Sequence, residues 1–527
     1  MNILKILETI HTGKAWKKIG VRHHHGINIP LASIWTINSL GIGEFLDLLP
    51  LIDYCSSLKL DILQLLPIND SGLDRSPYNI LSSTALHPIY LSLRALPHIP
   101  QDLQQELLTL QQYNRSKKIL YSQVLYKKMH WLHKYVEKNR AIIVKKKEYQ
   151  DFIQNHTWLF DYSLFKVLKK CYHNQLFQKW PHEIKNLHKN TQLKLAQTHA
   201  KEIEFYSIVQ YLCFVQLKIV KAHAEKKRVF LMGDIPILVS CDSVDVWTHR
   251  DFFDLSYVVG SPPNAFDSQG QVWSLPLYNW KALEKDHLKW WKRRIEVAKE
   301  YFHIYRLDHI LGFFRFWAIP NGKRADHGHF IPHRPDLMKE QGRKFLKTLI
   351  AFSDMLPIGE DLGDSPHFVR ECMQEYGIPG IRIFRYCRRW KTDRSFIPYE
   401  DYNPISLSSV STHDLETVYL WWKNFPHDAA NYAAFKKWPF SPKLSIQNQF
   451  DILWDNHHSN SLFHVNLFQE YLALVPELTW NNPDDERINI PGSKLRDNWR
   501  YRYKEPLDIL LKHAKLQTLF QQLLQKK

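Results

Sequence analysis

The sequence predicts an α/β fold, a (β/α)8 TIM barrel with inserted, largely helical subdomains and no C-terminal β-sandwich domain. The first observation behind this prediction is a series of short apolar runs that each end in polar or acidic residues. The second is that helix-like segments lie between many of these runs, as in a parallel sheet. The third is that the C-terminal ends of these runs are distributed over residues 61–414. A single nucleotide-binding crevice uses fewer strand ends, whereas a barrel assembles its site from many of them.

Six of these runs predict buried strands that deliver functional groups at their C-terminal ends. In chain order they are DILQLLPIND (61–70), VFLMGDIP (229–236), HIYRLDH (303–309), MLPIGEDLG (355–363), IPGIRIFRY (378–386) and ISLSSVSTHD (405–414). Helical spacing is found in HLKWWKRRIEVAKEYF (287–302), in HFVRECMQEYG (367–377) and in the C-terminal KEPLDILLKHAKLQTLFQQLLQ. No Pro/Gly/Ser-rich linker separates a further domain, so we expect one catalytic domain over residues 1–527.

Residues 95–225 interrupt the alternation of strands and helices. This region is rich in Leu, Lys, Gln and His, with apolar residues at helical spacing, as in QDLQQELLTLQQY. We therefore expect a mostly helical insertion between two of the barrel strands.

The formal charge of +17 is a weak indication of a polyanionic partner. The basic runs, such as VKKKEY (144–149) and AEKKRV (224–229), are short, lie in helix-like contexts and have no aromatic platform between their charges. Solvated helix faces explain them better than nucleic-acid binding does.

Cysteine usage and hydropathy favour a soluble, cytoplasmic protein. The six cysteines show no CxxC spacing, so neither a zinc knuckle nor a dense disulfide framework is indicated. The N-terminus lacks a long apolar region followed by small cleavage-site residues, and no run approaches the ~20 consecutive apolar residues of a membrane helix. We expect no membrane association.

Three carboxylates, Asp308, Glu360 and Asp414, stand at predicted strand ends. Glycoside chemistry needs a carboxylate pair, although barrel enzymes of other kinds also place acids at strand ends. Arg306 and Asp308 would lie on the same face of one strand, because side chains alternate along a strand. That arrangement is either a buried ion pair or the floor of an active site.

The sequence motifs around these carboxylates resemble those of one enzyme family. YRLDH resembles the R-x-D strand of the α-amylase clan, GEDLG its acid/base strand and STHD its His-Asp strand. Six stretches resemble the successive signatures of the 4-α-glucanotransferases, glycoside hydrolase family 77. They are LASIWTINSLGIGEFLDLLPLIDY (31–54), LQLLPIND (63–70), SPYNILSSTALHPIYLSL (76–93), GDIPILVSCDSVDVWTHRDFF (233–253), GSPPNAFDSQGQVWSLPLYNW (260–280) and ERINIPG (486–492). RLDHILGFFRFWAIP and HGHF (327–330) resemble the branch that contains the plant cytosolic disproportionating enzyme.

The resemblance implies a role for each matching residue. Asp308 would be the nucleophile, Glu360 the acid/base, and Asp414 the stabiliser of the oxocarbenium-like state. Substrate-binding positions would be Arg306, His413, Tyr78, Asp234, Gln271, Trp273 and Asn489. For Asp234 the alternative is to shape its strand end, and for Tyr78 and Trp273 it is ordinary packing.

No cofactor or metal is implied. Adjacent residues rarely bind the same metal ion, so the His23–His25 run does not indicate a metal site. GIG (41–43) matches neither the GxGxxG nor the Walker pattern. The resemblance also implies a lid-like loop at 260–280 that keeps water from the intermediate.

The chain departs from the usual sequence motifs of the family at several positions. They are Asn264 in GSPPN, Ser274 and Leu275 in GQVWSLP, His87 in the NP position, Glu44 in GIGE, and the THDLET variant of THDNDT. Loss of a glycine at Ser274 would stiffen the loop, and loss of an amide at Leu275 would remove a hydrogen-bonding group. These departures bear on acceptor preference rather than on the reaction.

The implied function is retaining 4-α-glucanotransfer on maltooligosaccharides and glycogen-like α-1,4-glucans. An α-1,4-glucan hydrolase of the same clan and a catalytically silent glucan-binding protein are the alternatives, and nucleic-acid binding is favoured only by charge. The sequence leaves the oligomeric state open.

Overall fold

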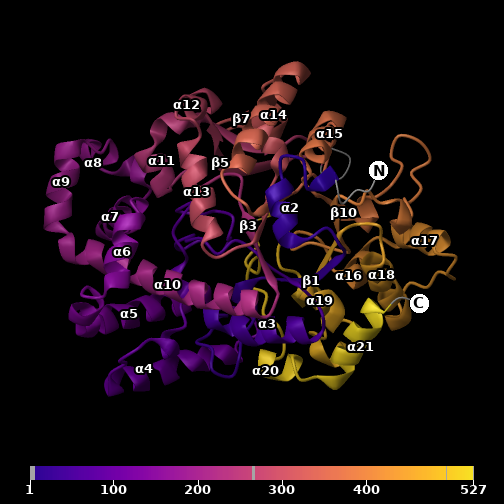
Figure 1. Ribbon diagram of the computed structural model, residues 1–527, viewed down its shortest axis with the longest axis horizontal. Coiled ribbons are helices and arrows are strands. Elements are labelled where there is room, and N and C mark those ends of the chain that lie inside the picture. The colour runs from indigo at the N-terminus through magenta and orange to yellow at the C-terminus, as the bar shows by residue number, and fades with distance from the viewer. Residues whose placement is uncertain (1–5, 264–267, 494, 526–527) are drawn as a thin grey trace.

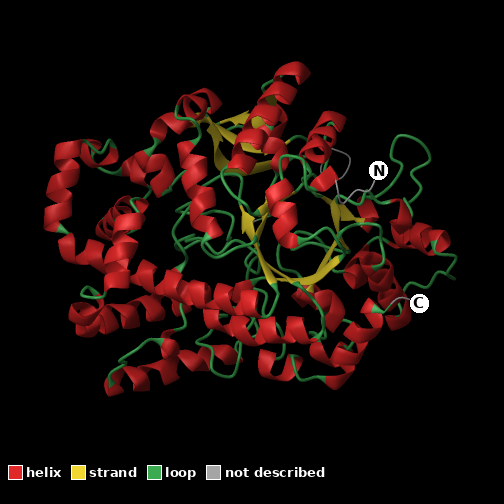
Figure 2. Cartoon of the chain, in the orientation of Figure 1, coloured by secondary structure: helices red, strands yellow, loops and turns green. Residues whose placement is uncertain are grey.

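A closed barrel lies at the centre of the computed structural model, which describes residues 6–263, 268–493 and 495–525 (Figures 1 and 2). Eight parallel strands form it in the order β1-β12-β11-β10-β9-β6-β3-β2. Their bounds are β1 His24–Ile29, β2 Ile62–Leu65, β3 Phe230–Ile235, β6 Ile304–Leu307, β9 Leu356–Gly359, β10 Gly380–Ile383, β11 Ser406–Ser409 and β12 Phe463–Leu467. The predicted barrel is confirmed.

All six predicted strands are barrel strands, and β1 and β12 complete the ring. Both of these strands carry polar residues that the barrel buries: His24 and His464 are 0% exposed, and so is Asn466. Strands buried on both faces usually read as continuous apolar runs. The polar residues inside HHGINI and FHVNL therefore conceal these two strands from a search for apolar runs.

A short helix covers the N-terminal end of the barrel. α2 (Gly13–Ile19) buries Trp16, whose indole N–H donates to Gly377 O at 2.9 Å and whose ring lies 5.7 Å from Phe463. Inward-facing apolar residues of the strands pack against the same helix. The C-terminal ends of the strands are left for polar side chains.

A second, antiparallel sheet lies beside the barrel in the order β5-β4-β7-β8. Its strands are β4 Phe253–Ser261, β5 Gln271–Tyr278, β7 Phe316–Pro320 and β8 His329–Ile331. The segment 260–280, expected as a lid-like loop, thus contains the end of β4 and all of β5 in its described residues. Asn264 lies outside the described residues.

The region between β2 and β3 supplies a group of helices on one side of the barrel, drawn in purple at the left of Figure 1. They are α4 Gln101–Gln111, α5 Tyr121–Ile143, α6 Lys147–Asn155, α7 Trp158–Cys171, α8 His182–Lys185, α9 Lys189–Thr198 and α10 Ala200–Lys226. α10 is long and apolar enough to cross a membrane, but most of it is buried inside the protein, as in the core helix of a soluble protein.

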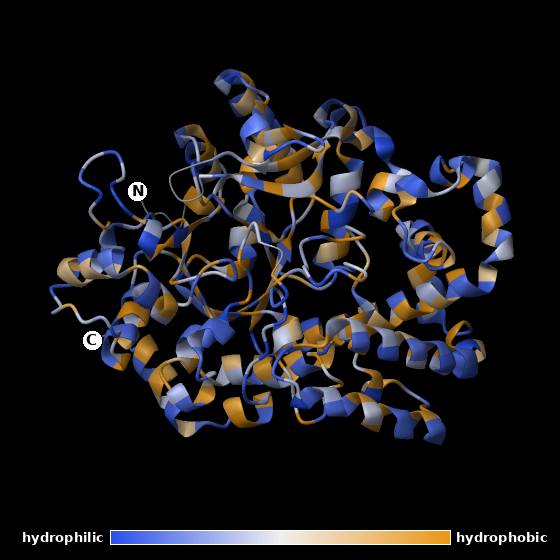
Figure 3. Cartoon of the chain, turned by 180° about the vertical axis from the view of Figure 1, so that it is seen from behind, coloured by the Kyte–Doolittle hydropathy of each residue, from blue (hydrophilic) through white to orange (hydrophobic). Residues whose placement is uncertain are grey.

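The remaining helices surround the barrel and mix hydrophilic with hydrophobic residues along their length (Figure 3). They are α3 Leu48–Ser57, α11 Val244–Thr248, α12 Trp280–Lys285, α13 Lys289–Lys299, α14 Pro335–Ala351, α15 His367–Tyr376, α16 Val418–Asn424, α17 Pro426–Phe435, α18 Ile446–His457, α19 Phe468–Leu472, α20 Leu507–Leu510 and α21 Ala514–Leu524. Such amphipathic helices bury one stripe against the sheet. The division into one domain with a helical insertion stays a prediction.

Candidate active site

Asp308 and Glu360 follow neighbouring barrel strands, β6 and β9. The Asp308 N–H donates to Ile235 O at 3.2 Å, and the Glu360 N–H donates to Leu307 O at 3.0 Å. The parallel ladder therefore continues one residue beyond each strand. It places both carboxyl groups side by side at the C-terminal end of the barrel, where sites of this fold are built.

Arg306 connects the acids at this end of the barrel. Its Nη1 lies 2.9 Å from Asp308 Oδ1 and 2.9 Å from Asp234 Oδ2, and its Nη2 lies 4.0 Å from Glu360 Oε2. Burial alone would lower the pKa of the Arg306 guanidinium, but Asp234 and Asp308 raise it well above its ordinary value. The permanently charged Arg306 guanidinium thus lies within 4.0 Å of three carboxyl groups.

Glu360 has the properties of a proton donor near neutral pH. Burial raises its pKa to about 7, an effect that Arg306 opposes and Asp308 reinforces. Each of its oxygens accepts one backbone N–H, from Leu362 at 3.1 Å and from His309 at 2.9 Å. General acids that work at neutral pH need a pKa raised in this way.

His309 was missed by the sequence analysis as a site residue. Its backbone is left-handed, with φ 44°, and this turn directs its N–H at Glu360. Burial lowers the pKa of its imidazole to about 4, which leaves the ring neutral, and Trp273 packs edge-on against it at 5.0 Å. The signal was available, because His309 directly follows Asp308 in the RLDH word.

His413, Asp414 and Asn489 form a second polar cluster. His413 Nε2 lies 3.1 Å from Asp414 Oδ2, and the Asn489 amide donates to Asp414 Oδ1 at 2.6 Å. Burial by itself would raise the pKa of Asp414, but the His413 imidazolium and the Asn489 amide lower it to about 2. Asp414 is therefore an anion with 40% of its side chain exposed, ready to accept hydrogen bonds.

Tyr78 lies between this cluster and Asp234. Its hydroxyl donates to Asp234 Oδ2 at 2.7 Å, and its ring stacks on His413 at 5.1 Å. Trp499, which the sequence analysis did not single out, lies 5.6 Å from the same ring. Asp234 has a fully buried side chain, and both of its oxygens already accept from Arg306. This favours the alternative in which Asp234 shapes the strand end.

Gln271 and Trp273 reach the site from β5. The Trp273 indole N–H donates to Gln271 Oε1 at 3.0 Å. A Cβ added at Gly492 would lie 3.5 Å from the Gln271 side chain, so β5 approaches the stretch that carries Asn489. The ten predicted site residues thus form one connected series of contacts that passes through Arg306 and, between Glu360 and Trp273, through His309. Their roles stay predictions.

One departure in β5, Ser274, lies at an unusual backbone conformation. Ser274, in the position of the family glycine, is held at φ 59°, a left-handed conformation that glycine adopts without steric cost. The Cys241 thiol donates to Ser274 O at 3.3 Å. The next residue, Leu275, is half-buried and packs against the core.

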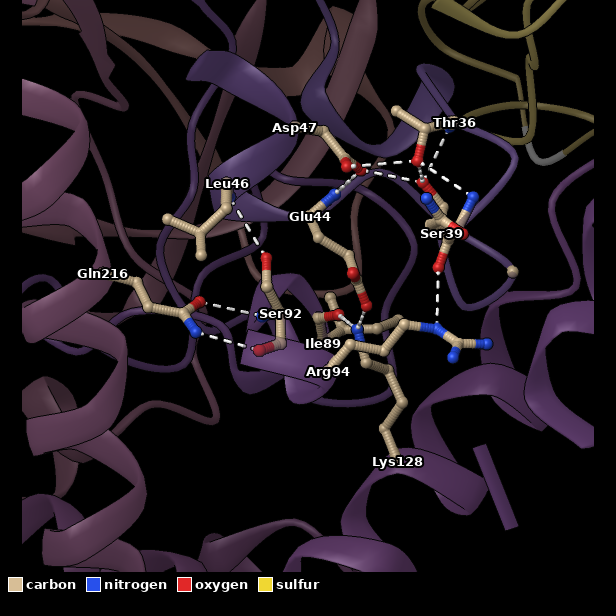
Figure 4. Close-up of polar contacts among 12 residues, drawn as sticks. Thr36, Ser39, Glu44, Leu46, Asp47, Ile89, Ser92, Arg94, Lys128 and Gln216 are labelled. Carbon is tan, nitrogen blue, oxygen red and sulfur yellow. Dashed lines mark hydrogen bonds and ion pairs between the residues drawn. The ribbon is translucent and has the colours of Figure 1, made fainter. Parts of the chain in front are cut away.

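The departures at Glu44 and His87 join the barrel to α5. Lys128 of α5 donates to Glu44 Oε1 at 2.6 Å and to Ile89 O at 2.7 Å, in the middle of the cluster drawn in Figure 4. His87 is bonded to Tyr121 of the same helix. These residues act on packing and do not contact the carboxylates of the site.

Metal ligands were not predicted, and in the described residues no three His, Cys, Asp or Glu side chains are grouped to hold a metal ion. The histidines of the 23–25 run have separate partners instead: His23 meets His464, His24 meets Asp61, and His25 meets His457.

A parallel barrel whose strand ends carry a carboxyl pair with an arginine between them has the groups that an enzyme acting on glycosidic bonds needs. Comparison with known proteins identifies the family. The 4-alpha-glucanotransferase family model matches residues 29–508. The chain belongs to this family, and its activity is that of a 4-alpha-glucanotransferase, as the sequence predicts.

Individual relatives agree with this assignment. The chain is 42% identical over 528 residues to the 4-alpha-glucanotransferase of Chlamydia pneumoniae, covering 99% of both chains. It is 33% identical to the rice 4-alpha-glucanotransferase DPE2, covering 94% of this chain and 69% of the rice enzyme. The solved amylomaltase from Streptococcus agalactiae in complex with acarbose shares the fold, with a TM-score of 0.79 at 22% identity, over 95% of this chain and 98% of that chain.

Proposed function

We propose that this enzyme cleaves an α-1,4 bond of a maltooligosaccharide or glycogen-like glucan and transfers the fragment to the 4-hydroxyl of glucose or another α-1,4-glucan. The observation that carries the mechanism is the carboxyl pair on β6 and β9, because Arg306 lies between the two acids and the pKa of Glu360 is about 7. One acid can then act as a nucleophile while its neighbour still holds a proton.

The reaction proceeds by double displacement. Asp308 attacks the anomeric carbon while Glu360 gives its proton to the departing glucan oxygen, which leaves a covalent glycosyl-enzyme. Glu360, now ionised, takes the proton from the 4-hydroxyl of the acceptor, whose oxygen displaces Asp308 from the anomeric carbon. Two inversions retain the α configuration, and no cofactor enters either step.

Asp414 and His413 bind the 2- and 3-hydroxyl groups of the distorted sugar. An anion that is already hydrogen-bonded to Asn489 is held in place before the positive charge of the transition state develops. Trp273 and Gln271 of β5 cover the acceptor side and favour a sugar over water at the glycosyl-enzyme.

We also propose that the reaction takes place in the cytoplasm. All six cysteines are free thiols, as expected for a protein of a reducing compartment.

Incubation of the purified protein with maltotriose tests transfer. We expect glucose together with a ladder of longer oligosaccharides. Glucose and maltose without longer products would identify a hydrolase, and binding without any product would identify a silent glucan-binding protein.

A further inference from the structure

One side chain holds both ends of the loop that carries His413 and Asp414. This loop, residues 410–417, connects β11 to α16. At its beginning the Ser411 hydroxyl donates to Glu470 Oε1. At its end the Val418 N–H donates to the same carboxyl group, 3.1 Å from Oε1 and 3.3 Å from Oε2. Glu470 belongs to α19, which directly follows barrel strand β12. The loop is therefore closed through a residue of the neighbouring strand-helix unit.

The surroundings of Glu470 indicate a positional role. The residue is 0% exposed, and the groups that donate to it, a hydroxyl and a backbone N–H, are both neutral. Burial raises the pKa of its carboxyl to about 7, an effect that the two hydrogen bonds and the Arg385 guanidinium oppose. Burying a carboxyl group costs free energy unless the group forms hydrogen bonds, and the contacts with Ser411 and Val418 offset this cost.

The preceding residue holds the other loop that reaches Asp414. The Gln469 amide donates to Glu486 O at 2.6 Å and to Glu486 Oε2 at 3.1 Å. Glu486 begins the ERINIPG stretch that carries Asn489, and Asn489 donates to Asp414 Oδ1 at 2.6 Å. Two consecutive residues of α19 thus hold the two loops that meet at this carboxylate.

We propose that Glu470 is a positioning residue for the glucan transfer reaction, acting by fixing the loop that places Asp414 against the sugar. The proposal rests on the role given to Asp414 under the proposed function. Glu470 itself is buried behind the loop and does not face the substrate. Its loss would shift Asp414 without removing any group that touches the glucan.

Substitutions of Glu470 test the proposal in the full-length enzyme. Glu470→Met removes the acceptor and should lower kcat for transfer from maltotriose about 10²-fold, because a misplacement near 1 Å has a cost of that order. KM should change much less than kcat. Glu470→Gln retains an oxygen for the Val418 N–H and an amide that can donate to the Ser411 hydroxyl, so it should stay close to wild-type kcat. A general packing defect would not separate these two variants in this way.

Glu44→Met is the matched control, since it removes another buried carboxyl whose pKa is raised to about 7 but which lies outside the loop. Its folded fraction should transfer at wild-type kcat. Should Glu470→Met not fold, Ser411→Ala decides, because it removes one of the two contacts and should lower kcat several-fold. Wild-type kcat in Ser411→Ala, or equal losses in the two Met variants, would overturn the proposal. Asp414→Asn is measured in parallel: if it keeps full kcat, the role of Asp414 fails instead.

Discussion

Arg306 Nη1 lies 2.9 Å from Asp308 Oδ1, although the two residues are separated by a single position in the chain. The same nitrogen lies 3.0 Å and 2.9 Å from the two oxygens of Asp234, on the neighbouring strand β3. The guanidinium cannot be deprotonated, so Asp308 keeps a cationic partner at every working pH. This is the condition that a carboxylate nucleophile requires.

Asp308→Asn should abolish transfer while leaving maltooligosaccharide binding measurable, because an amide cannot form the glycosyl-enzyme but preserves the shape of the site. Turnover of maltotriose and calorimetric binding of a longer oligosaccharide measure the two properties. Asp364→Asn, at an exposed position close in sequence to Glu360, is the control and should be fully active. Substantial activity in Asp308→Asn would mean that another residue is the nucleophile.

The pH profile should show an alkaline limb set by Glu360. Its pKa is raised to about 7, and the proton donor is the protonated form, so kcat/KM should fall as the pH rises through about 7. Glu360→Gln should nearly eliminate transfer from maltotriose. Maltosyl fluoride releases fluoride without protonation. Glycosyl-enzyme formation from this donor should therefore proceed in Glu360→Gln, and its rate should show no alkaline limb. An alkaline limb that survives with the fluoride would assign it to a different group.

Much of the site was predictable because its residues stand at strand ends within recognisable words. Asp308 and Glu360 directly follow strands β6 and β9, whereas Asp414 lies in the loop after β11 and was predictable from its STHD motif. The RLDH motif indicated His309 as a site residue, but neither its left-handed backbone nor the position of Glu470 was predictable, since hydrogen bonds to backbone groups leave no pattern of spacing. β1 and β12 were missed for a related reason: their interior residues are polar, and only the closed barrel supplies the partners that make their burial possible.

Ser274→Gly should relieve strain in β5. A non-glycine residue in the left-handed region costs about 1–2 kcal/mol, and the extra freedom of glycine in the unfolded chain returns about 0.5–1 kcal/mol of that. The net gain in unfolding free energy should be about 0.5–1 kcal/mol by denaturant titration. Ser261→Gly, in β4 and without a positive φ, should be destabilising instead. Equal effects at both positions would contradict strain at Ser274.

Lys128→Met should strongly destabilise the protein. The Lys128–Glu44 pair is buried, with side-chain exposures of 0% and 5%, so removing the cation leaves an unpaired buried acid at a cost of about 3–5 kcal/mol. Lys134→Met on the same helix breaks an exposed pair with Glu106, which should cost about 0–1 kcal/mol. Chemical denaturation compares the two variants. Similar losses would show that burial does not determine the strength of the pair at Lys128.

The histidines between β1, α18 and β12 should make the barrel sensitive to acid. His25 Nδ1 lies 3.0 Å from His457 Nδ1, a contact in which one ring must donate and the other accept. Burial, together with neighbouring histidines, lowers the pKa of His25 to about 4 and that of His457 well below its ordinary value, although Asp61 opposes the shift at His25. Protonation of the accepting ring at Nδ1 would turn two N–H groups toward each other.

The sign of the effect follows from these shifts. Between pH 6.5 and about 4 the unfolded chain binds more protons than the folded one at these positions, so the unfolding free energy should decrease as the pH falls through this window. His457→Gln removes one titrating ring and should flatten the decrease, although it costs some stability at pH 8. His367→Gln, at a residue with 85% side-chain exposure, should leave the slope unchanged. Thermal unfolding from pH 8 to pH 4 measures the slope, and a slope in His457→Gln as steep as in wild type would place the acid sensitivity elsewhere.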